Sequence, residues 1–179
     1  VEICFSPELI HLHSLKGKIV VVVDIFRATS TMIAALANGI SEIRTFADLE
    51  ECRQMSGEGY LIAGERNGLT AEGFELGNSP IAYLNDAYGG QKLAMTTTNG
   101  TLAISKSTGA SEILIGAFPN LSATLSYFQA KDHDVLIPCA GWKAMFNLGD
   151  VLHAGVSAKR LQDTHEVEEG GALGMRALF

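Results

Sequence analysis

Short apolar runs rich in β-branched residues recur along the chain and predict its strands. They occupy residues 1–5, 18–24, 42–46, 60–64, 92–96, 112–118 and 134–141. Several are almost continuously hydrophobic, which is typical of strands covered on both faces. Apolar residues at helical spacing fall between them, in residues 31–39, 47–55, 79–89, 120–130 and 148–161. This alternation predicts an α/β fold: a three-layer α/β/α sandwich with a largely parallel or mixed sheet.

A weak internal repeat fits this interpretation. Aligned without gaps, two stretches share a threonine, a glycine and the letters Ser-Glu-Ile, at Thr31 and Thr101, Gly39 and Gly109, and residues 41–43 and 111–113. Each copy reads as strand, polar turn, helix, glycine and strand. The length allows one sizeable core, so we expect a single unit over residues 1–179, with two similar halves (about 1–88 and 89–179) as a hypothesis. Because the chain stops inside an apolar stretch, we also expect a further C-terminal segment.

Composition narrows the classes of partner. The chain has 13 Lys and Arg against 20 Asp and Glu, a net charge of −7, and no basic stripe, which argues against nucleic acid. Its three cysteines are far apart, and no apolar segment is long enough for a bilayer or a signal core. We therefore expect a cytoplasmic protein without a membrane partner, and leave a homo-oligomer open.

Four polar segments follow predicted strands: residues 24–31, 64–80, 96–101 and 139–143. In doubly wound sheets, ligands bind beyond the carboxyl ends of the strands, so these segments should converge on one face. Residues 64–80 hold four glycines and show no periodicity, which is long for a plain connection. We expect an ordered loop folded over a site.

The turn at residues 24–31 carries the strongest candidates. Asp24 follows its strand directly, Thr29 or Ser30 can cap the next helix, and Arg27 suits phosphate or sulfonate oxygens. The alternative is that Asp24 merely closes a turn. The turn at residues 96–101 has the threonines and the Asn-Gly pair of an oxyanion cradle, or is simply a polar turn.

The other two segments offer carboxylates and backbone donors. Glu65 and Glu72 lie in the long loop, and carboxylates with oxygen-rich neighbours suit Mg²⁺, although most such side chains are solvated surface charges. Asp150 either stabilises a helix N-terminus or joins a metal site. Cys139 lacks the arginine of a cysteine phosphatase, since Met145 stands at that position, and is expected to be a small apolar group. The five histidines show no metal-binding spacing, and we expect them at the surface or an interface.

The four segments, in this order between about Ile19 and Gly155, resemble the 2-phosphosulfolactate phosphatase family, usually called the ComB family. The resemblance implies a three-layer α/β phosphatase of coenzyme M biosynthesis that uses Mg²⁺ to hydrolyse 2-phospho-3-sulfolactate, or a related phosphorylated 2-hydroxy acid. Members generally carry adjacent Glu and Asp where this chain has Gly149 and Asp150. The family also continues past the end of this chain.

These considerations give a set of predicted roles, with a small anionic phosphoester as the partner. We predict catalytic roles for Asp24, Arg27, Glu65 and Arg66, and metal ligands among Asp24, Glu65, Glu72 and Asp150. Substrate contacts are predicted for Thr29, Ser30, Thr31, Thr98, Asn99, Gly100, Thr101, Cys139, Gly141 and Lys143. The nucleophile is water oriented by a carboxylate or, in a variant, Asp24 itself. The rival hypothesis is a non-catalytic binder of small phosphorylated or sulfonated acids.

Overall fold

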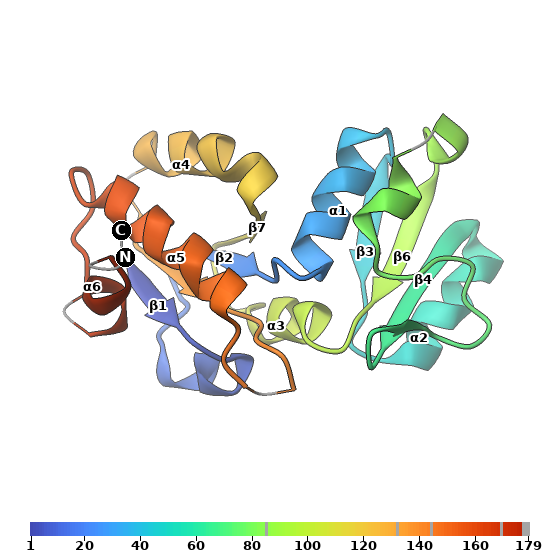
Figure 1. Ribbon diagram of the computed structural model, residues 1–179, viewed down its shortest axis with the longest axis horizontal. Coiled ribbons are helices and arrows are strands. Elements are labelled where there is room, and N and C mark those ends of the chain that lie inside the picture. The colour runs from blue at the N-terminus through green and yellow to red at the C-terminus, as the bar shows by residue number, and fades with distance from the viewer. Residues whose placement is uncertain (85, 132, 144, 169, 177–179) are drawn as a thin grey trace.

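The computed structural model describes residues 1–84, 86–131, 133–143, 145–168 and 170–176, and it confirms the α/β class. Its strands form two four-stranded sheets, which lie at the two ends of the view in Figure 1. The first sheet has the order β1-β8-β2-β7, and all its strands are parallel. Its members are β1 (Glu2–Cys4), β8 (Val135–Pro138), β2 (Ile19–Val23) and β7 (Glu112–Gly116).

The second sheet has the order β3-β6-β4-β5. Its members are β3 (Glu42–Thr45), β6 (Lys92–Thr96), β4 (Tyr60–Arg66) and β5 (Leu69–Thr70). The first three are parallel, and β5 pairs antiparallel with β4. All seven predicted strands are present, and β5 is an addition inside the segment 64–80. The Asn67-Gly68 pair explains it, since both residues have positive φ and this pair favours a tight hairpin turn.

Each sheet is covered on both faces, which is the three-layer arrangement that we expected (Figure 1). On one face of the first sheet, the apolar core includes residues of α4 (Leu121–Gln129), α5 (Leu148–Leu161) and α6 (Gly171–Arg176). Its other face packs on α3 (Gly100–Lys106) and the 3₁₀ helix η1 (Pro7–Leu12). The second sheet lies between α1 (Ala28–Ala37) and α2 (Leu49–Gln54), which is followed by the 3₁₀ helix η2 (Met55–Glu58).

The two copies of the repeat cross between the sheets in opposite directions. The unit β2–α1–β3 leaves the first sheet and enters the second, whereas β6–α3–β7 leaves the second and returns to the first. The helices α1 and α3 contact each other between the sheets (Figure 1). Each sheet therefore contains strands from both copies, and the ends of β2 and β6 meet in the middle of the molecule.

One predicted helix is wrong. Residues 79–89 form two short 3₁₀ turns, η3 (Pro80–Tyr83) and η4 (Asp86–Tyr88), with a break at Leu84, whose ψ of 50° is not helical. Tyr83 is buried, and its hydroxyl donates to the Gly77 carbonyl at 3.2 Å. The turn η3 also packs on α1. This packing and the hydrogen bond of Tyr83 together stabilise the short 3₁₀ turn. A further 3₁₀ turn, η5 (Phe118–Asn120), precedes α4.

Candidate functional site

The four predicted segments meet where β2 and β6 end. Arg27 reaches from the β2–α1 turn to the loop 64–80, where its Nη2 donates to the Gly68 carbonyl at 3.1 Å. The Thr98 N–H donates to the Glu65 carboxylate at 3.2 Å, which joins that loop to the β6–α3 turn. The fourth segment is joined through Asp150, which bonds to Ile25 and Gly141. Polar segments far apart in sequence therefore surround one point.

Asp24 lies at the centre of this arrangement and is almost fully buried. Burial raises the pKa of Asp24 to about 7, and the negative charge of Asp150 is the next largest cause. The backbone N–H groups of Ala28 and Arg27 oppose the shift, whereas the charge of Glu65 adds to it. Asp24 is thus a carboxylate whose charged form is poorly compensated by the protein alone.

Glu65 is the second buried carboxylate, and it extends from the end of β4. One oxygen accepts from the Thr98 hydroxyl at 3.2 Å and from the Gly68 N–H, and the other accepts from the Thr98 N–H. The tight Asn67-Gly68 turn places the Gly68 N–H back over Glu65. The hairpin β4–β5 therefore holds this side chain in position at the site.

Asp150 is the third, and it is fully buried in the first turn of α5. Its Oδ1 accepts from the Ile25 N–H at 2.8 Å, and its Oδ2 accepts from the Gly141 N–H at 2.9 Å. Burial raises the pKa of Asp150 to about 6, and these two hydrogen bonds oppose the shift. Both oxygens thus face the backbone of neighbouring turns.

The hydroxyl groups at the two helix starts stabilise the turns themselves. The Thr29 hydroxyl shares its one O–H between the carbonyls of Asp24 and Gly116, whose oxygens lie 2.9 and 2.8 Å away. The Thr101 hydroxyl donates to the Thr97 carbonyl at 2.9 Å. Ser30 and Thr31 likewise donate to backbone carbonyls. Each of these four hydroxyls thus has a partner within the protein, and their contacts with substrate stay predictions.

Gly100 brings the start of α3 against Asp24. A Cβ at this position would lie 2.5 Å from the Ala28 Cβ and 2.8 Å from the Asp24 Oδ2, distances that side-chain carbons do not reach. Asn99, just before it, is also buried. Only glycine at residue 100 therefore allows the start of α3 to lie against the start of α1.

The three predicted cations have different surroundings. Arg27 is half-buried and reaches across to Gly68, as described above. Arg66 is tied down more fully, since it donates to the Glu65 carbonyl at 2.7 Å and to the Thr96 hydroxyl at 3.0 Å. Lys143 is exposed, and its Nζ lies 5.7 Å from the centroid of the Trp142 ring. Arg27 is the cation that lies closest along the chain to Asp24.

Three predicted site residues remain: Cys139, Gly141 and Glu72. Cys139 is buried, and burial raises the pKa of its thiol well above the usual range, which fits the small apolar group that we expected. Gly141 contacts Asp150 through its N–H. Glu72 is exposed, and its backbone carbonyl accepts from Arg53 at 3.0 Å. No interaction joins Glu72 to Asp24, Glu65 or Asp150 in the described part of the chain.

The donors at the site suit a hard cation. Asp24, Glu65 and Asp150 are buried oxygen ligands, and within the described ranges none of them forms an ion pair with Lys or Arg. In the same ranges, no group of three or more His, Cys, Asp and Glu is placed to enclose an ion by itself. Mg²⁺ usually takes one or two carboxylates together with water and phosphate oxygens, so Asp24 and Glu65 fit it.

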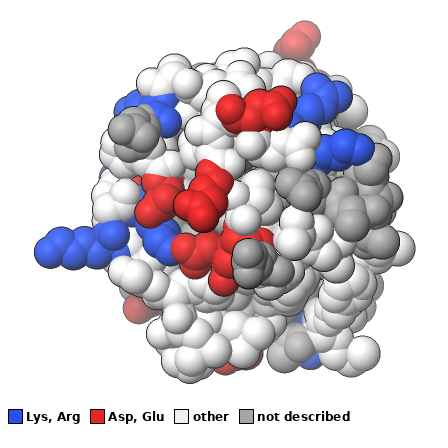
Figure 2. Space-filling view, turned by 90° about the vertical axis from the view of Figure 1, so that its left-hand side faces the viewer, with Lys and Arg blue, Asp and Glu red and all other residues white. Residues whose placement is uncertain are grey.

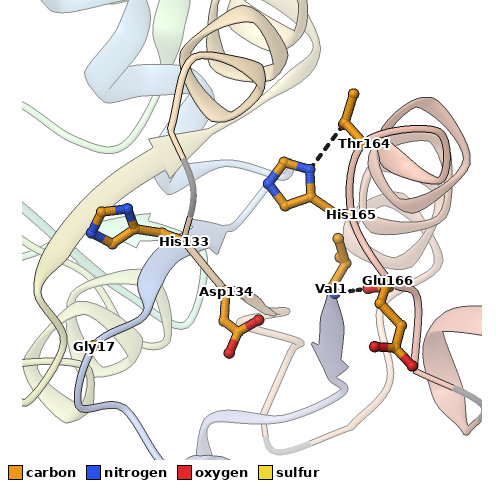
Figure 3. Close-up of a pocket in the computed structure, with 7 residues that line it drawn as sticks. All are labelled: Val1, Gly17, His133, Asp134, Thr164, His165 and Glu166. Carbon is orange, nitrogen blue, oxygen red and sulfur yellow. Dashed lines mark hydrogen bonds between the residues drawn. The ribbon is translucent and has the colours of Figure 1, made fainter.

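Two hollows near the N-terminus lie away from these residues. A cavity of about 390 Å³ near the N-terminus is lined by Val1, Gly17, His133, Asp134, Thr164, His165 and Glu166, none of them a predicted site residue (Figure 3). A neighbouring hollow includes Glu2, Asp134, Glu166 and Glu168, and Figure 2 shows acidic side chains gathered at this end. Such a surface repels a phosphoester.

Among the described residues, no helix has the length and apolarity needed to cross a membrane.

His153 corrects the prediction for the histidines. It is 1% exposed, and its ring packs against Phe118 with the centroids 5.4 Å apart. Neither ring nitrogen forms a hydrogen bond of normal geometry with a described residue, and burial lowers the pKa of His153 to about 4. The prediction was wrong because α5 is buried along most of its length, so this position faces the sheet. The sequence did contain a signal for this burial, because His153 lies one helical turn after Asp150 and the two side chains therefore share one face of the helix.

Comparison with known proteins agrees with the resemblance in the sequence. The family described as 2-phosphosulpholactate phosphatase matches residues 4–178. A relative from Thermotoga maritima, described as a probable 2-phosphosulfolactate phosphatase, is 44% identical over 142 residues, or 79% of this chain and 62% of the relative. A relative from Caldanaerobacter subterraneus with the same description is 39% identical over 158 residues, 86% of this chain and 66% of the relative.

A third relative, from Clostridium beijerinckii, has the same description and is 35% identical over 169 residues, 92% of this chain and 71% of that protein. The chain spans less than two thirds of the length of the first two relatives. The family match, over residues 4–178, nevertheless includes all four segments that form the site. The chain belongs to the 2-phosphosulpholactate phosphatase family.

Proposed function

We propose that this protein is a phosphoric monoester hydrolase that acts on 2-phospho-3-sulfolactate or a related phosphorylated 2-hydroxy acid. The observation that carries the proposal is the meeting of Asp24, Glu65 and Asp150, three buried carboxylates without an ion pair among the described residues, beside the polar turns. A cluster of this kind is unfavourable unless a cation balances its negative charge, and a bound cation in turn attracts a phosphate group. The names of the relatives support the same chemistry.

In this proposal, Asp24 and Glu65 hold Mg²⁺, which when bound supplies positive charge to the phosphoryl oxygens. Arg27 contacts a terminal oxygen of the substrate, and the backbone N–H groups of residues 99 and 100 bind another. The N–H groups of residues 140–142, which were also predicted to bind substrate, already donate to Val23, Asp150 and Met145. A carboxylate of the site orients the water that attacks phosphorus. The bond between phosphorus and the oxygen on C2 breaks, and inorganic phosphate and the hydroxy acid leave.

The test is phosphate release from 2-phospho-3-sulfolactate and from 2-phospholactate, with Mg²⁺ and with a chelator. We expect release that requires the metal and that falls to background in Asp24→Asn. The matched control is Glu75→Gln, which removes an exposed carboxylate of the loop 64–80 and should leave the rate unchanged. Binding of both esters without release by the wild-type protein would favour the rival hypothesis of a non-catalytic binder.

A further inference from the structure

The first turn of α5 contacts the β2–α1 turn at two successive residues. Ile25 donates its N–H to the Asp150 Oδ1 at 2.8 Å. The ring of the next residue, Phe26, occupies the space beside Gly149, where a Cβ would lie 2.9 Å from ring carbons. Ile25 and Phe26 directly follow Asp24 and precede Arg27. Gly149 and Asp150, which we call the platform, thus support the segment that carries the predicted site residues Asp24 and Arg27.

The same carboxylate also holds the β8–α5 turn. The Gly141 N–H donates to the Asp150 Oδ2 at 2.9 Å, and Gly141 has a φ of 66°. A Cβ on Gly141 would lie 2.5 Å from the Met145 carbonyl oxygen, so this turn has no room for a side chain. Hydrogen bonds from N–H groups to a buried carboxylate are strong and directional. Asp150 therefore links two turns that are distant in sequence.

We propose that Gly149 and Asp150 are positioning residues, which fix the β2–α1 turn against the β8–α5 turn, and that Asp150 is not a metal ligand. Asp150 acts through its two N–H donors, and Gly149 acts by having no side chain, so that Phe26 can lie against α5. This inference rests on the proposed function in one respect, because it assumes that Asp24 and Arg27 are the groups being positioned.

The first experiment uses the wild-type protein and does not measure turnover. Amide hydrogen exchange of Ile25 and Gly141 is followed by NMR with and without Mg²⁺. If Asp150 only positions the turns, both amides stay protected, or become more so, when the ion binds. If the carboxylate turns toward the ion, at least one amide loses its acceptor. Exchange that becomes tenfold faster with Mg²⁺ at either residue would overturn the inference.

The second experiment compares Asp150→Asn with Asp24→Asn. An amide group keeps only one acceptor oxygen, so the resonances of both Ile25 and Gly141 should move in Asp150→Asn. We expect kcat/KM to fall by about 10- to 100-fold, as for groups that orient a site from behind. Calorimetry should show Mg²⁺ binding retained in Asp150→Asn and lost in Asp24→Asn. Loss of Mg²⁺ binding in both variants would contradict the positioning role.

The third experiment tests Gly149. The variant Gly149→Ala should displace the Phe26 ring, shift the Ile25 amide resonance and raise KM more than it lowers kcat. Adding Phe26→Ala removes the contact, so the double variant should have the same Ile25 resonance as Phe26→Ala alone. An unchanged resonance and unchanged kinetics in Gly149→Ala would show that the platform does not include this residue. If the wild type releases no phosphate, the proposed function fails, but the amide measurements still decide the role of Asp150.

Discussion

The two turns at the centre of the molecule share a backbone device but differ in chemistry. In the β2–α1 turn, the Thr29 hydroxyl accepts from the Asp24 N–H at 3.0 Å and donates to its carbonyl. In the β6–α3 turn, Thr101 does the same with Thr97, at 3.1 and 2.9 Å. The first turn thus presents a carboxylate at the position where the second presents a hydroxyl. The same hydrogen-bonded backbone arrangement thus places a charged side chain on one side of the site and an uncharged side chain on the other.

The contrast shows where the electrostatic demand lies. The carboxylate of Asp24 is buried, and besides this burial the negative charges of Asp150 and Glu65 raise its pKa. Thr97 is equally buried but neutral, so it can be accommodated without a counter-charge. In the proposed function, this asymmetry between the two turns makes the site selective for a cation and a phosphoester, and the following predictions test it.

The largest effect is expected from Asp24→Asn, with Thr97→Ser as its partner in the comparison. Removing the carboxylate should lower kcat by about 10²- to 10⁴-fold, the range typical of groups that act directly on the reaction. Thr97→Ser keeps the hydroxyl and should change kcat by less than about tenfold, because Ser preserves the bond to the Thr101 N–H. The measurement is steady-state phosphate release. Equal losses in both variants would mean that the two turns are functionally equivalent.

The next largest effect concerns pH and His153, whose ring lies beside Gly116 at the end of β7. The folded-state pKa of about 4 is below the unfolded value of about 6.5, so only the unfolded chain takes up a proton between these values. Stability is therefore complete above pH 6.5 and falls as the pH drops toward 4, by up to about 3 kcal/mol.

His153→Leu should remove that dependence. Urea unfolding of the wild type and of His153→Leu at several pH values gives the difference, and His133→Gln, which alters an exposed histidine, serves as the control. We expect the free energy of unfolding of His153→Leu to fall less between pH 6.5 and 4. Parallel curves for the wild type and the variant would refute the predicted proton uptake.

A smaller effect separates the two threonines. Thr101 closes only its own turn, whereas Thr29 also donates to Gly116 and so joins the β2–α1 turn to β7 of the second unit. Thr29→Val leaves more backbone groups unpaired, so it should reduce stability by about 2 to 3 kcal/mol, against about 1 to 2 for Thr101→Val. Chemical unfolding measures both, and Thr29→Ser should restore most of the loss. A larger cost for Thr101→Val would reverse the order.

Much of this arrangement could be predicted from the sequence, because strands and turns leave local signals. The valine run that ends at Asp24 predicts a buried strand followed by a site. The alignment of the repeat pairs Thr101 with Thr31, whereas the structure shows that Thr29 makes the equivalent hydrogen bonds. The division of the strands between two sheets leaves no such signal, because strand pairing depends on contacts far apart in the chain. The two hydrogen bonds that Asp150 accepts were equally hidden, since its partners Ile25 and Gly141 become neighbours only in the fold.

The smallest effect tests the aligned glycines that end the two helical segments. Gly39 has a φ of 98° and a Cβ there would lie 3.3 Å from the Gly89 Cα, whereas Gly109 has no positive φ and its Cβ would meet only Leu15 at 3.6 Å. Gly39→Ala should therefore cost about 1 to 2 kcal/mol of stability, because an alanine is strained in the left-handed region. Gly109→Ala should be neutral, or stabilise by about 0.4 to 1 kcal/mol through the unfolded chain. Thermal or urea unfolding of the two variants measures the difference, and the two sites should add independently in the double variant. Equal losses of stability in the two variants would mean that the two glycines, which the sequence alignment treats as equivalent, are also equivalent in conformation. The difference between the β2–α1–β3 and β6–α3–β7 units would then be confined to the site itself.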